Sequence, residues 1–585
     1  MYTILENARI VVDLLKKHKI RYIVISPGGS NIPVIQAVQQ DDFFKCYSVV
    51  DERSAMYFAI GLYLKTGEII ATSCTTANAT RNYVPGLTEA FYKRVPILAL
   101  TMSKHPMYLS QEYMQCPIQT SLPIDCVKKS FSVPRIKDEY DRAMCVRITN
   151  EAILELTHHG NGPVQLNIEE LDSETWVFDN SAVLPDVRMI KRYEKVINDF
   201  DFSKKKIMIL IGENVPLSMD EYNSIEKFCE SHNAFVYTNH LSNYHGKYSI
   251  NANLLVGSTS DEIFTKDLRP DVLITFGGIT GDYNIYRKLF SLSKYIEEHW
   301  RISKDGDVID TYNQLTRVYQ MGLNDFFDAW DDNLNIHDYF EKWQEYDNRL
   351  DRNILLPFSN TFAAQQLCNK IPKNSYMNYA ILNSLRSWLV FNIDKSIKCF
   401  SNVASFGIDG CLSTFLGESV VTDELCFLII GDLSFYYDMN AIGIRHIKDN
   451  VRILLVNNNG GVEFKLGDLQ YKTDVSSYIA ADNHFKNAEG WAGTQGFKYI
   501  SARNKEEFSA NVDSFISDSD RPIIFEIFTN PEDEKKAGFM LVDKNRNATP
   551  SEQMKQGIKN TIKNVIGNEN SAKLKIGRAS CRERV

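Results

Sequence analysis

The sequence contains no apolar run long enough to cross a membrane, which takes roughly 18 or more residues. Its uninterrupted apolar runs, such as 426–430 and 453–456, have the length of single strands. No positively charged stretch followed by an apolar core stands at the amino terminus, so no secretion signal is expected. These absences predict a cytoplasmic protein that does not bind membranes.

Cysteine patterns typical of metal binding or redox chemistry are also missing. The 11 cysteines include no Cys-x-x-Cys pair and no cluster with histidine at zinc spacing, so we expect reduced thiols. Positive charge is scarce as well, because 65 lysines and arginines against 74 acidic residues give a net charge of −9. A nucleic-acid partner would favour a basic surface, so none is expected.

The end of the chain is set apart by its sequence. Residues 576–585 match the conceptual translation of a common sequencing-library adapter, and we expect them to be an artefact. They close a stretch, 546–585, that we expect to form a tail outside the folded domains.

Short apolar strands that alternate with helical patterns dominate the rest of the chain, which predicts buried parallel sheets. A chain of 585 residues also exceeds what one hydrophobic core can hold. We therefore expect an α/β protein with three doubly wound parallel-sheet domains, at 1–185, 186–345 and 346–545. The clearest strands are expected at 22–25, 47–50, 69–74, 97–100, 207–211, 272–276, 426–430, 451–456 and 523–527.

Two successive strands of the third domain are followed by oxygen-bearing groups. One strand ends in Gly431-Asp432, and the next ends before Asn458, with Gly460 shortly after. In doubly wound sheets, ligands bind beyond the carboxyl ends of strands. Carboxylate, amide and backbone oxygens are the ligands that Mg²⁺ prefers. Asp432, Asn458 and Gly460 are therefore predicted to hold Mg²⁺ or Mn²⁺, and the helix N-termini beyond these turns favour a diphosphate.

In the first domain, an acidic pair opens a helix directly after a strand, at Asp51-Glu52. Alone, this pattern is typical of a helix N-terminus, where carboxylates are stabilised by the dipole. Together with the other motifs it resembles the thiamine-diphosphate enzymes, and most of all the succinyl-enolpyruvyl-hydroxycyclohexene-carboxylate synthase family of menaquinone biosynthesis. The matching motifs are Ser26 to Gly28, Asp51 to Ala55, Tyr83 to Gly86, Ile279 to Gly281, Gly407 to Gly410, Gly431 to Ser434 and Asn457 to Gly461.

The resemblance implies pyrimidine-binding, central and diphosphate-binding domains in that order, with thiamine diphosphate as the cofactor. It implies that Glu52 is catalytic and bonds the aminopyrimidine ring, and that Ile408 bends the cofactor. It places the site between two subunits, so a homodimer or homotetramer is expected. The further cofactor-binding residues that it implies are Ser384, Gly407, Asp409, Gly431, Leu433, Ser434 and Gly461.

The substrate-binding positions depart from that family. Ser30 and Val403 stand where the family has arginine, and Asp282-Tyr283 replaces a Lys-Arg pair. Each charge-assisted hydrogen bond is worth about 1.5–3 kcal/mol, so their loss would weaken the binding of a polycarboxylate. Asp282 is expected to repel such a substrate. The candidate substrate-binding residues are Ser30, Asn31, Thr76, Arg81, Lys104, His105, Arg386 and Lys465.

These features predict an enzyme that decarboxylates a small-molecule 2-oxo acid. The resulting carbanion is then either protonated or passed to an acceptor, with formation of a C–C bond. The altered positions favour a less anionic substrate pair; the alternative is the menaquinone synthase itself. A non-catalytic scaffold is disfavoured because Glu52, Asp432 and Asn458 are all present, and an acetolactate-synthase-like flavoenzyme is a further alternative. The donor, the acceptor and the pathway stay open.

Overall fold

The computed structural model describes residues 1–330, 338–466 and 475–549. The adapter-like residues 576–585 and most of the expected tail lie outside this part. Contacts divide the chain into two compact units, Met1–Lys195 with Glu298–Met321 and Val196–Glu297 with Gly322–Val585. The expected domain boundaries after residues 185, 345 and 545 stay predictions.

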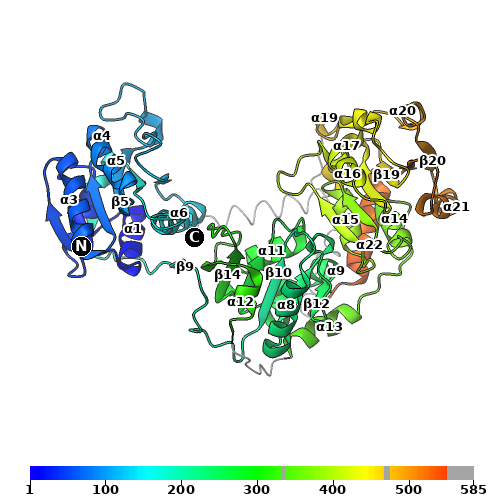
Figure 1. Cartoon of the computed structure of the whole chain (residues 1–585), viewed down its shortest axis with the longest axis horizontal. Coiled ribbons are helices and arrows are strands. Elements are labelled where there is room, and N and C mark those ends of the chain that lie inside the picture. The colour runs from blue at the N-terminus through cyan, green and yellow to red at the C-terminus, as the bar shows by residue number, and fades with distance from the viewer. Residues whose placement is uncertain (331–337, 467–474, 550–585) are drawn as a thin grey trace, which may run out of the picture. The chain divides into compact units, whose positions relative to one another are not determined.

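The first unit is built on a six-stranded sheet with the order β3-β2-β4-β5-β7-β6, in which all pairs are parallel (Figure 1). Its strands are β2 (Tyr22–Ile25), β3 (Lys45–Ser48), β4 (Ile70–Cys74), β5 (Ile97–Lys104), β6 (Ser130–Val133) and β7 (Val164–Glu170). The chain runs outward from β2 to β3 and then in the opposite direction from β4 to β5, so the order reverses between β2 and β4. Loops after these two strands therefore flank the crevice where such sheets bind ligands.

Helices pack on both faces of this sheet, where they form two separate hydrophobic clusters. One cluster includes α1, α2 and α6, and the other includes α3 and α5. The helices are α1 (Glu6–Lys17), α2 (Ile32–Gln39), α3 (Glu52–Thr66), α4 (Asn78–Asn82), α5 (Val84–Tyr92), η1 (Pro106–Tyr108), α6 (Glu139–Glu155) and α7 (Asp172–Thr175). The unit also contains the antiparallel pair β1 (Tyr2–Thr3) and β8 (Phe178–Asp179), and the parallel strands β14 (Glu298–Ser303), β15 (Leu315–Gln320) and β9 (Lys191–Tyr193).

The second unit contains a six-stranded parallel sheet with the order β17-β16-β18-β19-β21-β20. Its strands are β16 (Tyr376–Tyr379), β17 (Lys398–Ser401), β18 (Cys426–Gly431), β19 (Val451–Asn457), β20 (Lys498–Ala502) and β21 (Ile523–Phe528). The order reverses between β16 and β18, which places the loops after these strands at the crevice. The surrounding helices are α14 (Asn360–Leu367), α15 (Asn383–Leu389), α16 (Cys411–Ser419), α17 (Asp432–Tyr437), η5 (Met439–Gly443), α18 (Glu463–Leu466), α19 (Val475–Ala480), α20 (Glu489–Thr494), α21 (Lys505–Ile516) and α22 (Pro531–Lys544).

The same unit carries four further parallel strands in the order β12-β11-β10-β13. They are β10 (Ile207–Ile211), β11 (Phe235–Thr238), β12 (Ser249–Asn251) and β13 (Val272–Phe276). Their helices are α8 (Met219–His232), η2 (His240–Ser242), α9 (Asn253–Ser258), α10 (Asp261–Ile263), η3 (Phe264–Leu268), α11 (Tyr283–Ser291), η4 (Ser293–Tyr295), α12 (Leu323–Phe327) and α13 (Tyr339–Asn348). The expected α/β class with parallel sheets is thereby confirmed.

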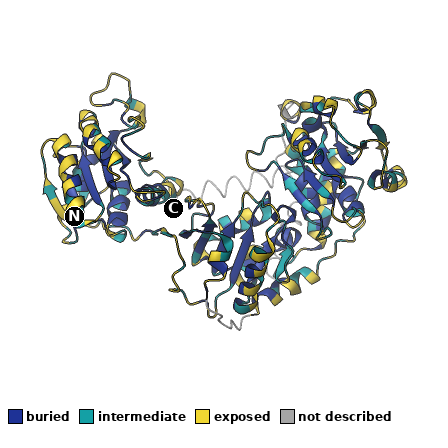
Figure 2. Cartoon of the chain, in the orientation of Figure 1, coloured by how far each residue is buried: buried dark blue, intermediate teal, exposed yellow. Residues whose placement is uncertain are grey.

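One expected strand is misplaced. The apolar pattern at 47–50 predicted a strand there, but β3 pairs with β2 from Lys45 to Ser48. The reason is that β3 is an edge strand with mostly exposed residues, as Figure 2 shows beside the buried central strands. An edge strand needs no continuous apolar run, so the pattern does not mark its ends.

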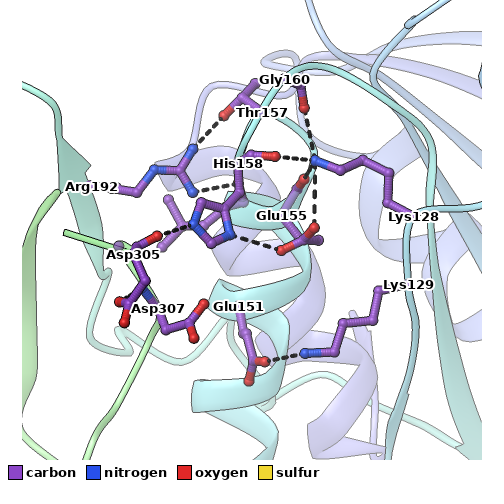
Figure 3. A network of polar contacts seen from close by, with 12 residues as sticks. Lys128, Lys129, Glu151, Glu155, Thr157, His158, Gly160, Arg192, Asp305 and Asp307 are labelled. Carbon is purple, nitrogen blue, oxygen red and sulfur yellow. Dashed lines mark hydrogen bonds and ion pairs between the residues drawn. The ribbon is translucent and has the colours of Figure 1, made fainter. Parts of the chain in front are cut away.

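A polar network closes the carboxyl end of α6 (Figure 3). The Lys128 ammonium donates to the carbonyls of Glu155 (2.7 Å), Gly160 (2.8 Å) and His158. The ring of His158 contacts the Glu155 carboxylate through Nδ1 (3.2 Å) and the Asp305 carbonyl through Nε2 (2.6 Å). The bond to Glu155 satisfies a carbonyl at the end of α6, and the other bonds hold the segment that follows the helix.

None of the described helices combines the length and apolar character that a membrane span requires.

Candidate active site

Glu52 is the first residue of α3, directly after its N-cap. The cap is Asp51, whose carboxylate accepts hydrogen bonds from the backbone N–H groups of Arg53 (2.9 Å) and Ser54 (3.4 Å). The Glu52 carboxylate itself accepts a hydrogen bond from Asn82 Nδ2 at 3.0 Å. Because Asp51 caps the helix, the Glu52 carboxylate has no capping role. It is oriented by Asn82, a side chain of α4.

The loops after β2 and β4 meet at the crevice of the first unit. Asn31 is buried and donates to the Ser26 carbonyl (3.0 Å) and the Ser73 hydroxyl (3.2 Å), while Ser30 N–H donates to the Thr75 hydroxyl (3.3 Å). The Thr76 hydroxyl is buried and has no hydrogen-bond partner among the described residues. The structure therefore brings Ser30, Asn31 and Thr76 to one crevice, which is consistent with a binding role.

The cations expected to bind substrate in the first unit already have partners. The Lys104 ammonium pairs with Glu170 (2.6 Å) and with Asp172. Burial opposes its charge, but these carboxylates raise the pKa of Lys104 above the ordinary value. His105 lies 3.4 Å from Glu169, and Arg81 donates to the Ile118 carbonyl (3.2 Å).

In the second unit, Asp432 and Asn458 follow β18 and β19, as the sequence predicts. Asp432 is 2% exposed, and burial raises the pKa of its carboxyl. Its Oδ1 accepts from Leu433 N (2.7 Å), and its Oδ2 accepts from Gly460 N (3.0 Å). Asn458 is 5% exposed, and its Oδ1 is a buried acceptor without a hydrogen-bond partner among the described residues. Such an orphaned oxygen, in a turn whose Gly460 N–H bonds the Asp432 carboxylate, fits a hard cation such as Mg²⁺.

The cofactor-binding residues implied by the resemblance lie at or after the carboxyl ends of neighbouring strands of this sheet. Ser384, in the second position of α15, lies with its hydroxyl 4.0 Å from the place where a Cβ on Gly431 would stand. Ser434 donates from its hydroxyl to the Ile408 carbonyl (2.6 Å) and so ties the loop 407–410 to α17. Gly407, Asp409, Leu433 and Gly461 lie in these same loops and turns.

The expectation that helix N-termini favour the diphosphate stays a prediction. α17 begins at Asp432, directly after β18, and α18 begins at Glu463, shortly after Gly461. The metal ion and the backbone N–H groups of the turns are further candidates for holding a diphosphate.

Asp282 is a buried helix cap and not an exposed charge, and the expectation that it repels an anionic substrate stays a prediction. Asp282 is 2% exposed and caps α11, where its carboxylate accepts from the N–H groups of Asn284 (2.9 Å) and Ile285 (3.3 Å). It also accepts a hydrogen bond from the Tyr237 hydroxyl (2.5 Å). Burial raises the pKa of Asp282. The side chain thus has a structural role at the start of α11.

Arg386 lies against the residue that follows Asp282. Its guanidinium carbon is 4.2 Å from the centre of the Tyr283 ring, and it forms an ion pair with Glu463. Arg386 Nε and Glu463 Oε2 are both buried without a hydrogen-bond partner among the described residues. Lys465, in the same short helix as Glu463, pairs with Asp482. Arg386 therefore keeps a donor for a ligand, although its charge is already balanced.

Two residues that contact the predicted site were missed. Asn82 bonds Glu52 and adjoins the matching motif at Tyr83, so its position in the sequence could have suggested it. His484 bonds the Asp432 carboxylate at 3.0 Å, and no motif marked it.

Comparison with known proteins identifies the family. Residues 6–122 match the model of the thiamine pyrophosphate enzyme, N-terminal TPP binding domain. The 2-succinyl-5-enolpyruvyl-6-hydroxy-3-cyclohexene-1-carboxylate synthase of Phocaeicola vulgatus is 33% identical, over 91% of this chain and 97% of the relative. The synthases of Bacteroides thetaiotaomicron and Porphyromonas gingivalis are 32% and 25% identical, over 97% and 95% of their lengths. The chain thus belongs to the 2-succinyl-5-enolpyruvyl-6-hydroxy-3-cyclohexene-1-carboxylate synthase family of thiamine-diphosphate-dependent enzymes.

Proposed function

We propose that this protein catalyses the reaction for which its relatives are named, the formation of 2-succinyl-5-enolpyruvyl-6-hydroxy-3-cyclohexene-1-carboxylate. A succinyl group is what remains of 2-oxoglutarate after loss of CO₂, and the ring is that of isochorismate. The observation that carries the proposal is the 33% identity that extends over 97% of a synthase of this name. It favours the synthase over a decarboxylase that only protonates its intermediate.

The chain's own residues divide the work between activation and binding. When bound, thiamine diphosphate supplies the carbanion that attacks the 2-oxo carbon and the electron sink that allows CO₂ to leave. Glu52 holds a proton at the pyrimidine nitrogen, and Asn82 keeps the carboxylate in position through its 3.0 Å hydrogen bond. Asp432, Asn458 and the Gly460 carbonyl would hold Mg²⁺, which would supply positive charge for the diphosphate.

Arg386 is the residue that we propose to receive a substrate carboxylate in the second unit. Its Nε is buried and has no hydrogen-bond partner among the described residues, and its guanidinium carbon lies 4.2 Å from the centre of the Tyr283 ring. A planar guanidinium matches a carboxylate better than an ammonium does. A carboxylate at Arg386 would compete with Glu463, whose second oxygen has no partner among the residues that the structure describes.

A less anionic substrate pair is the second candidate. The observation in its favour is that Lys104, Arg386 and Lys465 each form an ion pair with an acid of their own unit. Val403, at a position where the family has arginine, is fully buried. In this case the enzyme would keep the same cofactor chemistry and use a smaller donor such as pyruvate.

We also propose that the enzyme works as a homo-oligomer, so that Glu52 of one subunit and Asp432 of another complete each site. The helix that begins with Glu52 exposes Tyr57 (47%), Phe58 (42%) and Leu64 (66%). Burying such residues against a second copy would be favourable. Light scattering coupled to size exclusion should give twice or four times the mass of one chain.

The test is a panel of 2-oxo acids, assayed for CO₂ release in the presence of isochorismate as the acceptor, with and without thiamine diphosphate and Mg²⁺. The proposal predicts cofactor-dependent release from 2-oxoglutarate. Release from pyruvate, with 2-oxoglutarate inert, would replace it with the second candidate. No release from any donor would contradict both.

A further inference from the structure

A short segment packs directly on the turn that is predicted to hold the metal ion. We call this segment, residues 480–486, the strap, and the turn comprises residues 457–461. Four backbone-mediated hydrogen bonds join them: Gly461 N to Ala480 O (2.5 Å), Asn483 N to Asn459 O (3.0 Å), Phe485 N to Asn459 Oδ1 (2.8 Å) and Asn457 Nδ2 to Lys486 O (2.8 Å). The position of the strap is therefore fixed by the turn.

The packing between strap and turn leaves no room for a side chain at Gly460. A Cβ there would stand 2.5 Å from Asp482 Oδ1 and 2.9 Å from the Ala480 carbonyl. Gly460 also has a φ of +153°, which residues with a side chain rarely adopt. The absence of a side chain at Gly460 thus permits the close approach of the strap, besides the predicted role of this residue in the metal site.

The strap carries His484, whose ring lies against Asp432. The side chain is 9% exposed and meets the Tyr436 ring edge-on, with the ring centres 5.3 Å apart. Its Nδ1 accepts the backbone N–H of Lys486 at 3.0 Å. In a neutral ring the proton therefore lies on Nε2, which donates to Asp432 Oδ2 at 3.0 Å. The backbone of the strap thus sets which nitrogen faces the carboxylate.

We infer that His484 is a positioning residue, which holds the Asp432 carboxylate in the orientation that the divalent cation requires. His484 Nε2 and Gly460 N both donate hydrogen bonds to Asp432 Oδ2, and together they limit rotation of the carboxylate. The inference rests on the proposed function only in that it needs the metal site of a thiamine-diphosphate enzyme. Partners that orient a metal ligand in this way typically contribute about 10- to 100-fold to metal affinity.

The experiment compares three substitutions at this position. His484→Gln places an amide N–H near the position of Nε2, whereas the amide of His484→Asn stops short of Asp432, and His484→Leu has no donor. The matched control is His446→Leu, because His446 is an exposed histidine in the same unit. Binding of Mn²⁺ is followed by electron paramagnetic resonance, as loss of the free-ion signal, at a fixed saturating concentration of thiamine diphosphate.

We expect the apparent Kd for Mn²⁺ to rise about 10- to 100-fold in His484→Asn and His484→Leu. It should stay within about threefold of the wild type in His484→Gln and in the control. The difference in Mn²⁺ affinity between His484→Gln and His484→Asn tests the inference even if His484→Leu fails to fold. Equal affinity in His484→Asn and the wild type, or equal weakening in Gln and Asn, would overturn the inference. A wild type that takes up no Mn²⁺ with the cofactor would overturn the proposed function as well.

Discussion

Replacing Asn458 with leucine should have opposite effects in the presence and absence of metal. The Asn458 Oδ1 is a buried acceptor without a partner among the described residues, and such a group costs about 1–3 kcal/mol in the metal-free protein. Leucine has a similar shape and no polar atom. The metal-free variant should therefore be as stable as the wild type or more stable, by up to about 3 kcal/mol.

With Mg²⁺ and thiamine diphosphate the order reverses. Ligands at about 100 times their Kd stabilise the wild type by about 2.7 kcal/mol, and the variant should lose this gain because a metal ligand is missing. The matched control is Asn450→Leu, since Asn450 is equally buried at 5%. Its amide donates to the carbonyls of Ser419, Thr422 and Glu424, so its loss should destabilise the protein with or without metal.

The assay is urea unfolding followed by tryptophan fluorescence, in EDTA and in saturating Mg²⁺ with cofactor. Two results would refute the reasoning. One is a metal-free Asn458→Leu that is as unstable as Asn450→Leu. The other is a ligand-induced gain in Asn458→Leu equal to that of the wild type.

Further perturbations test the activating residue, the Asp282 cap and the α6 end. Glu52→Gln should keep Mg²⁺-dependent cofactor binding, measured by fluorescence titration, but lower kcat by about 10²- to 10⁴-fold, because an amide cannot move the proton; unchanged kcat would contradict the role. Asp282→Ala should lower the free energy of unfolding by about 2–4 kcal/mol, since it removes a helix cap and the hydrogen bond from the Tyr237 hydroxyl. Asp282→Asn should lose less stability than Asp282→Ala. The difference in free energy of unfolding between the wild type and Asp282→Asn should shrink as pH rises through the folded pKa of Asp282. Burial raises that pKa, so the folded wild type binds the proton more tightly than the unfolded chain and loses stability with rising pH. A gap between Asn and wild type that does not change with pH would contradict this. Lys128→Met should destabilise the first unit by about 1–3 kcal/mol, because the carbonyls of Glu155, His158 and Gly160 lose this donor. Lys129→Met, whose ammonium bonds Glu151 at the surface, should have a much smaller effect in thermal unfolding.

The sequence predicts the parts of the fold that depend on local pattern. The buried strands of the parallel sheets are continuous apolar runs, so β10, β13, β18 and β19 lie where the pattern places them, to within a residue at their ends. Asp432 and Asn458 follow from the same pattern, because strand ends in parallel sheets converge at one edge. The edge strand β3 lies outside this rule because it is exposed on one side.

Contacts between segments far apart in the sequence could not be predicted. Asp282 reads as a charge in a loop, and only the fold shows that Tyr237, 45 positions earlier, encloses it. His484 reaches Asp432 from 52 positions away. The sequence favours a substrate role for Lys104 because its partners Glu170 and Asp172 come from β7 and α7, which no short motif connects to it.

The central claim is that this protein joins a succinyl group to a cyclohexadiene acceptor with thiamine diphosphate and Mg²⁺. The most direct measurement is mass spectrometry of a reaction that contains 2-oxoglutarate, isochorismate and both cofactors. The account predicts a product with the mass of 2-succinyl-5-enolpyruvyl-6-hydroxy-3-cyclohexene-1-carboxylate, absent when Mg²⁺ is removed or when Glu52→Gln replaces the wild type. Consumption of 2-oxoglutarate to succinic semialdehyde without that product, or no consumption at all, would contradict it.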